Sequence, residues 1–431
     1  MSLTTNQSLH CKSDLHCVLV HFLSLTFITF ATGEDAPNQI ADHSPGAAAE
    51  NNGSIWAQDT LTGDWDGYRK KVEDDGITVA ATMVGQGFYN VSGGISRRST
   101  VASTFDSSVS IDAGKALNWN GAIFYADFEN HAGLDPSQVL VGDLEKFTKL
   151  NYSAFSQISE IWYQQRLGDD TIRIKLGKVD ANSEFSVIDN GLQFLSSSTQ
   201  VSPTIIVFPT FPDPMPSANV FFNPNDLYYV SIGAYYANRN DRFLDFSGSP
   251  QAAQVTQWGM LFIGETGLKW KHLDDWQADG NVRVGYWEDT GTFTTLNGGQ
   301  QKDDHGCYVI VNQTLWKPSS KDDEPRGARI FLEYAQTPGD ISIIDRHIGG
   351  GLAWTGLFSS RPVDLIGLSP QYVRLSNRAD LPKTYELAIE GFYQYQIAPW
   401  ISLQPDLQYI CNPGGRYSND FIGTIQFVCH F

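Results

Sequence analysis

The feature that most restricts the fold of this chain is a two-residue alternation of apolar and polar side chains near its C-terminus. Residues 384–396 and 400–411 both place apolar or aromatic residues at most second positions, with mainly acids, amides and serine between them. The apolar set is Tyr385, Leu387, Ile389, Tyr393, Tyr395, Ile401, Leu403, Leu407 and Tyr409, and the polar set is Glu386, Glu390, Gln394, Ser402, Gln404, Asp406 and Gln408. A period of two is typical of β-strands with two unlike faces. The three-residue break between the segments predicts a hairpin.

The same alternation recurs along most of the chain and ends at an aromatic residue, Phe431. Sixteen segments are predicted as strands: 77–89, 104–116, 120–131, 157–167, 171–178, 217–223, 227–238, 260–271, 279–288, 306–317, 325–337, 347–357, 364–374, 384–396, 400–411 and 420–431. The gaps between them alternate between tight turns, such as 168–170, 224–226 and 397–399, and long loops. The long loops are predicted at 132–156, 179–216, 239–259 and 289–305.

An even number of strands, with short turns at one rim and long loops at the other, is typical of a transmembrane antiparallel β-barrel. In such a barrel the apolar face meets lipid, the polar face lines a wet lumen, and closure leaves no unpaired edge. Sixteen strands would enclose an aqueous channel. In a dry sandwich core, Glu386, Glu390 and Asp406 would each cost several kcal/mol unless partnered. A sheet whose polar face meets bulk solvent is the remaining alternative.

Composition and the N-terminal segment indicate an exported protein. The chain has 431 residues, with 29 basic and 48 acidic side chains and a net charge of −19, which argues against nucleic acid as a partner. The apolar run 18–31 is too short to cross a bilayer as a helix, but it follows Lys12 and precedes small residues, as in a secretion signal. We therefore expect a signal peptide over 1–33, a flexible segment over 34–60 and the barrel over 61–431, with a short helix over 64–75 ahead of the first strand.

The sequence offers little support for a metal site, a disulfide framework or an enzyme. After removal of a signal, Cys307, Cys411 and Cys429 would remain, an odd number without CxxC spacing. His305 beside Cys307 supplies only two ligand types in a predicted loop. Glu386 and Glu390 suggest a glycosidase, but four strand positions span roughly 13 Å, beyond the ~5–9.5 Å of paired catalytic carboxylates. We expect no cofactor, no metal and no catalysis.

The predicted inner wall carries the candidate solute-binding residues. With Asp169 and Asp170 as a two-residue hairpin loop, Arg166 should lie opposite Arg173, and Gly177 opposite Trp162. An indole facing the lumen could stack on the C–H face of a sugar, while charged groups bind its hydroxyls; alternatively, Trp162 merely packs on the wall. The expected pore-lining set, with basic residues facing acids across the lumen, is Glu160, Trp162, Arg166, Arg173, Lys175, Glu386, Glu390 and Asp406.

Three stretches resemble the carbohydrate-selective porins of Gram-negative outer membranes, the OprB-like family. They are "LTGDWDGYRKKVEDDGIT" from Leu61, "RIKLGKVDANSEF" from Arg173, and "QIAPWISLQPDLQYICNPGG" from Gln396. The resemblance covers residues 61–431 and implies a sixteen-stranded outer-membrane barrel, narrowed by inward-folded loops, that passes mono- or oligosaccharides by diffusion. The barrel could be a monomer or a homotrimer. A porin for other solutes, a surface-anchoring barrel, and a secreted carbohydrate-binding protein or glycosidase remain alternatives.

Overall fold

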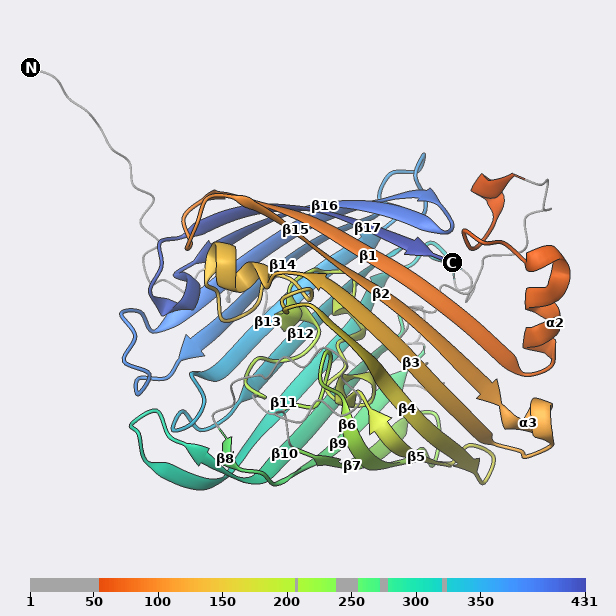
Figure 1. Cartoon of the computed structure of the whole chain (residues 1–431), viewed down its shortest axis with the longest axis horizontal. Helices are drawn as coiled ribbons and strands as arrows, with labels where there is room; N and C mark the ends of the chain where they lie inside the picture. Colours follow the sequence, from red (N-terminus) through yellow and green to blue (C-terminus); the bar gives the residue numbers. More distant parts are fainter. Residues whose placement is uncertain (1–53, 206–207, 238–254, 272–277, 320–323) are drawn as a thin grey trace, which may run out of the picture.

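The strands form one antiparallel sheet that closes on itself (Figure 1). A computed structural model of the protein describes residues 54–205, 208–237, 255–271, 278–319 and 324–431. Each strand of the wall pairs antiparallel with the next, and β1 pairs with both β2 and β17, which closes the barrel. The described residues contain seventeen strands, and among them β8 pairs only with the outer end of β10, whereas β7 pairs directly with β9. The wall therefore has sixteen strands, and the predicted barrel is confirmed.

Most strands of the wall are long enough to cross a bilayer obliquely, since a tilted transmembrane strand needs about 9–11 residues. They are β1 Ile77–Ser92, β2 Ser99–Asp112, β3 Ala122–Gly133, β4 Phe155–Leu167, β5 Ile172–Val179, β6 Met215–Phe222, β7 Tyr228–Tyr236, β8 Val255–Gln257, β9 Met260–Trp270, β10 Gly280–Thr294, β11 Gln300–Trp316, β12 Gly327–Gln336, β13 Ile344–Thr355, β14 Leu365–Leu375, β15 Tyr385–Ala398, β16 Ile401–Cys411 and β17 Asp420–His430.

The helices are short and lie at the ends of the barrel or within its loops. They are α2 Tyr68–Asp74, α3 Ala113–Leu117, a π-helical turn η3 at Ser137–Val141, and the 3-10 turns η1 Ile55–Ala57, η2 Trp65–Gly67, η4 Ala181–Ser183, η5 Asp189–Gly191, η6 Ser197–Thr199 and η7 Pro413–Gly415. Figure 1 shows α2 and α3 at the same rim, at the right of the view. None of the helices in the described ranges is long and apolar enough to cross a bilayer.

The faces of the strands follow the predicted alternation. In β15, Glu386 and Glu390 are buried inside the barrel, whereas Ile389 and Tyr395 are exposed on its outer surface. In β16, Asp406 is buried inside while Leu407 is exposed outside. Because the exposed residues of the outer wall are largely Leu, Ile, Val, Phe and Tyr, this surface is suited to lipid.

Most predicted strand ends differ from the structure by a few residues, and two predicted segments differ more. The predicted loop 289–305 is largely strand, because β10 and β11 continue to pair beyond a bulge after Asp289 and turn at Thr295–Gly299; its acid- and amide-rich sequence lacks the apolar alternation of the membrane-facing wall. The predicted strand 104–116 instead begins at Ser99 and ends at Asp112, whose carboxylate accepts hydrogen bonds from Gly114 N and Lys115 N and caps α3.

The remaining sequence predictions concern the termini and the cysteines. The predicted signal over 1–33, together with Cys11 and Cys17, lies outside the described residues. The predicted helix over 64–75 is a 3-10 turn followed by α2, with the Asp64 carboxylate accepting a hydrogen bond from Lys70 N. Cys307, Cys411 and Cys429 form no disulfide bond with one another.

Candidate functional site: the lumen and its inward-folded loops

Two long loops from the same rim fold into the barrel and narrow its lumen. The first spans 134–154, between β3 and β4, and the second spans 180–214, between β5 and β6. They contact each other through Lys149, whose amide donates to Leu195 O at 2.9 Å and whose Nζ donates to Leu192 O at 2.8 Å. Together they divide the lumen, so the geometry of the channel depends on what holds these loops to the wall.

Acidic residues of the wall hold the loops by accepting backbone hydrogen bonds. Glu386 accepts from Leu144 N at 2.9 Å, from Glu145 N at 2.8 Å and from Gly414 N. Glu390 accepts from Leu195 N at 2.5 Å and Ser196 N at 3.0 Å. Both carboxylates point inward as predicted, but their oxygens are occupied by loop amides, so they act in the structure as loop anchors.

Asp406 lies beside these anchors on the neighbouring strand. Its side chain is buried, and its Oδ1 accepts from Gln408 Nε2 at 3.1 Å. Gln408 Nε2 also donates to Phe147 O at 2.8 Å, which links this part of the wall to the first loop. The acidic side of the lumen thus supports the loops over two adjacent strands.

The predicted basic residues of β5 are paired with an acid of the second loop. Arg173 forms two hydrogen bonds with Glu184, Nη1 to Oε1 at 3.1 Å and Nη2 to Oε2 at 2.7 Å, and Lys175 Nζ forms a short ion pair with the same carboxylate. Burial alone would raise the pKa of Glu184, but Lys175 and Arg173 lower the pKa to about 2. This bidentate geometry fixes the start of the loop on the wall.

Trp162 and Gly177 face each other as predicted, and so do Arg166 and Arg173. The indole, however, is only 4% exposed. Tyr125 stacks on one face at a centroid distance of 4.7 Å, and Lys175 Nζ lies 3.9 Å from the ring centroid. A solute therefore cannot use the face of Trp162 as a platform without displacing a neighbour, and the alternative of wall packing describes its contacts.

Glu160 and Arg166 complete the predicted set. Glu160 accepts hydrogen bonds from Asp180 N and Trp162 Nε1, both at 2.8 Å. Arg166 lies at the short-turn rim, where its Nη1 is 3.4 Å from Asp170. Asp169 and Asp170 both adopt positive φ, as a two-residue hairpin turn requires. The predicted residues therefore lie at two places, along β4–β5 and along β15–β16, rather than around one solute.

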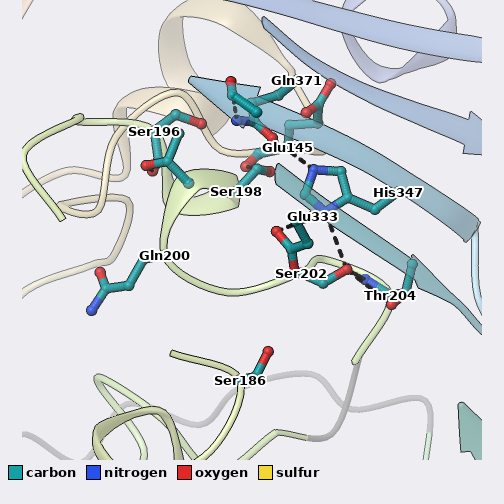
Figure 2. Close-up of polar contacts among 12 residues, drawn as sticks. Glu145, Ser186, Ser196, Ser198, Gln200, Ser202, Thr204, Glu333, His347 and Gln371 are labelled. Atoms are coloured by element: carbon teal, nitrogen blue, oxygen red, sulfur yellow. Dashed lines mark hydrogen bonds and ion pairs between the residues drawn. The ribbon is translucent and has the colours of Figure 1, made fainter. Parts of the chain in front are cut away.

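A second polar network joins the loop 180–214 to the opposite wall. Figure 2 shows His347 between Gln371 and Ser202, with Glu333 beside it and Ser196 and Ser198 nearby. His347 Nε2 lies 2.9 Å from Gln371 Oε1, and Nδ1 lies 3.2 Å from Ser202 Oγ and 3.4 Å from Glu333 Oε2. The network fixes the loop at a third position that the sequence analysis did not identify.

Apolar packing also holds the loop. Phe194 lies edge-on to Phe331 and Phe392 at centroid distances of 5.8 and 5.0 Å. Gly351 and Gly367 make room for these rings, since a Cβ at Gly351 would lie 2.5 Å from Phe331 Cε1 and one at Gly367 would lie 2.3 Å from Phe392 Cε1. Within the run Gly349–Gly351, Gly351 is thus the packing site for the loop aromatic Phe194.

Open space remains on the short-turn side of the second loop. A cavity of about 230 Å³ is lined by Asp189, Asn190, Lys269, Asn281, Asn312 and Arg329, among others. A second cavity of about 210 Å³ lies beside the turns at 168–171 and 223–227 and shares Lys269 with the first. The guanidinium of Arg329 has no hydrogen bond or ion pair within the described part of the chain, so it is available to a solute.

The chain matches the carbohydrate-selective porin, OprB family, over residues 96–431. It belongs to this family. Porin B of Pseudomonas aeruginosa is 23% identical over 404 residues, covering 82% of this chain and 87% of that protein. The high-pH structure of OprB from Pseudomonas putida is similar with a TM-score of 0.76 at 19% identity, covering 87% of this chain and 99% of that one. The low-pH structure of the same protein has a TM-score of 0.59.

Membership of the carbohydrate-selective porins confirms the predicted family, and with it the location and the class of solute. The protein is a porin of the Gram-negative outer membrane that passes sugars by diffusion through its barrel. Since the family consists of porins, the protein is placed among channels rather than enzymes. Which residues of the lumen contact the sugar is a separate question.

Proposed function

We propose that sugars cross this carbohydrate-selective porin through the space left beside the loop 180–214, with recognition centred on the cavity that contains Arg329. The observation that carries the proposal is the unpartnered guanidinium of Arg329 in a cavity lined mainly by amides and charged groups, with Thr314 and Trp270. Amides and a guanidinium supply several donors and acceptors for hydroxyl groups. Lys269, which lines both cavities, continues this polar path toward the short-turn rim.

In this proposal the residues selected from the sequence act mainly by shaping the path. Arg173 and Lys175 hold Glu184, Glu160 holds Asp180, and Glu386 and Glu390 hold loop amides, while Arg166 and Asp406 lie at the edges of these contacts. Trp162 supports Lys175 and Tyr125 from behind. Their common role is to keep both loops against the wall, so that the remaining opening has a fixed shape.

Transport in this account is passive and involves no covalent chemistry. A neutral sugar exchanges part of its hydration shell for wall groups as it passes, and it must leave as easily as it enters. We therefore expect millimolar affinity, about −4 kcal/mol. Because the path lies within one chain, it would serve a monomer and a homotrimer alike.

The test compares sugar-dependent block of ion current in planar bilayers. We expect Arg329→Ala to reduce glucose block by about tenfold, equivalent to ~1.4 kcal/mol, the order of a hydrogen bond to a charged group. Arg416→Ala, at an exposed position of the external loop 412–419, is the matched control and should leave block unchanged. Arg173→Ala should also lower block and shift selectivity toward cations, because it leaves Glu184 with one cationic partner. Unchanged block in Arg329→Ala would refute the assignment.

A further inference from the structure

Three carboxylates that are distant in sequence meet on the inner wall. We propose that Asp106 of β2 and Asp127 and Glu129 of β3 form a divalent-cation site, best suited to Ca²⁺. Asp106 lies directly opposite Glu129 in the register of the two strands, and Asp127 lies two residues away on the same face of β3. One carboxylate oxygen from each residue lies within 4.8 Å of the others.

The carboxylates of this cluster are only partly satisfied. Ser159 and Gln157 hydrogen-bond to Glu129, and Asp106 and Asp127 share a hydrogen bond within the cluster. Asp127 and Glu129 are 6% and 8% exposed, and Asp127 Oδ1 and Glu129 Oε2 are buried without a hydrogen-bond partner. Within the described ranges, no ion pair involves either residue or Asp106. Three carboxylates therefore repel one another, and two of their buried oxygens have no hydrogen-bond partner. A bound cation would offset both the repulsion and the cost of burying these oxygens.

Glu265 is an example of a lumen acid that the barrel satisfies with hydrogen-bond donors. Glu265 accepts hydrogen bonds from Ser186 N at 2.9 Å and from the hydroxyls of Tyr229 and Tyr308, each at 2.7 Å. Glu160, which lies opposite Asp127 across β3 and β4, is likewise occupied by Asp180 N and Trp162 Nε1. Glu160 is therefore committed elsewhere, and three carboxylates remain for the cation.

The type of ligand favours Ca²⁺ over a smaller ion. Ca²⁺ binds carboxylate oxygens at about 2.3–2.6 Å in flexible geometry, so three oxygens within 4.8 Å of one another can share one ion. Mg²⁺ requires near-ideal octahedral geometry at about 2.0–2.1 Å and gives up its water ligands reluctantly, so a cluster of three protein carboxylates suits it less well. Asp106 is only half-buried, so the site can be reached from the lumen, and water can complete the six to eight ligands that Ca²⁺ takes.

A cation here would have two effects. It would link β2 to β3 across the wall, and it would offset most of the negative charge of the cluster, two residues from the Tyr125–Trp162 stack. The inference does not depend on the proposed sugar path, because it concerns a different part of the wall.

The test uses full-length protein refolded from inclusion bodies, so that lipopolysaccharide does not bind the added metal. After treatment with chelator, CaCl₂ is titrated by calorimetry, and ion selectivity is measured from reversal potentials with and without CaCl₂. We expect one Ca²⁺ per chain with a Kd on the order of 10⁻⁴–10⁻³ M, as in extracellular sites, and weaker binding of Mg²⁺. Bound Ca²⁺ should also make the channel less cation-selective.

The double variant Asp127→Asn/Glu129→Gln should lose binding, or weaken it by at least about tenfold, because two of three charged ligands are removed. The control Glu73→Gln/Asp74→Asn removes the same charge from α2 outside the lumen and should bind as the wild type does. Asp106→Asn, at the half-buried position, replaces the double variant if that variant does not refold. Absence of binding to the wild type up to about 10 mM CaCl₂, or equal binding by the variants, would overturn the proposal.

Discussion

The loop 180–214 should be released locally when its anchor on β15 is removed. Glu390 accepts two backbone hydrogen bonds, from Leu195 N and Ser196 N. A hydrogen bond to a charged group contributes about 1.5–3 kcal/mol, so Glu390→Ala should weaken docking of this segment by at least about 3 kcal/mol. Since about 1.4 kcal/mol corresponds to a factor of ten, the open population of the segment should rise by about 10²-fold.

Hydrogen exchange measured by mass spectrometry reports this change directly. Where opening limits protection, amides of a peptide covering 191–199 should exchange about 10²-fold faster in Glu390→Ala than in the wild type. Amides near Glu184, which is held separately by Arg173 and Lys175, should not change. Glu386→Ala is the matched control, since it should affect amides 144 and 145 and leave 195 and 196 protected. Equal exchange in 191–199 for wild type and Glu390→Ala would refute the assignment of Glu390 as an anchor.

Two further predictions concern packing and pH. Gly351→Ala should lower stability by about 1–3 kcal/mol through overpacking against Phe331 and Phe194. The control Gly391→Ala should not lower stability, because its Cβ would meet no atom closer than 3.9 Å. Thermal unfolding in detergent measures the stability of both variants. The pKa of Glu184 is depressed to about 2, so its ion pairs contribute fully above the ordinary value of 4.5 and are lost as pH falls toward about 2. Exchange near residue 184, corrected for intrinsic rates, should therefore be constant from pH 7 to pH 5 and rise below about pH 4, and an increase already at pH 6 would contradict this.

The strands of the wall could be predicted because the alternation and the turns that define them involve residues close together in the sequence. The alternation around Glu386 and Ile389 assigns each side chain to a face, and a tight turn at Asp169–Asp170 fixes the register of Trp162 with Gly177. Strand ends were less predictable, as at β10 and β11, where pairing continues through a polar sequence that no longer faces lipid.

The interior could not be predicted in the same way, because it depends on contacts between distant residues. The sequence does not reveal that Glu386 meets Leu144, or that Phe194 fills the space left by Gly351. The sequence also does not show that Asp106 lies beside Glu129, because this neighbourhood follows from the register of β2 with β3. A signal was present, since acids on an inward face need partners and a glycine run on a strand indicates close approach of another group, but neither identifies the partner.

The central claim is passive passage of sugars through this barrel, and liposome swelling tests it most directly. Proteoliposomes containing the purified protein, with no energy source, are diluted into an isotonic monosaccharide solution and followed by light scattering. The account predicts swelling that is faster than in protein-free liposomes and faster for the monosaccharide than for a zwitterionic amino acid of similar mass. If the proteoliposomes swell no faster in the sugar solution than protein-free liposomes do, the account is contradicted.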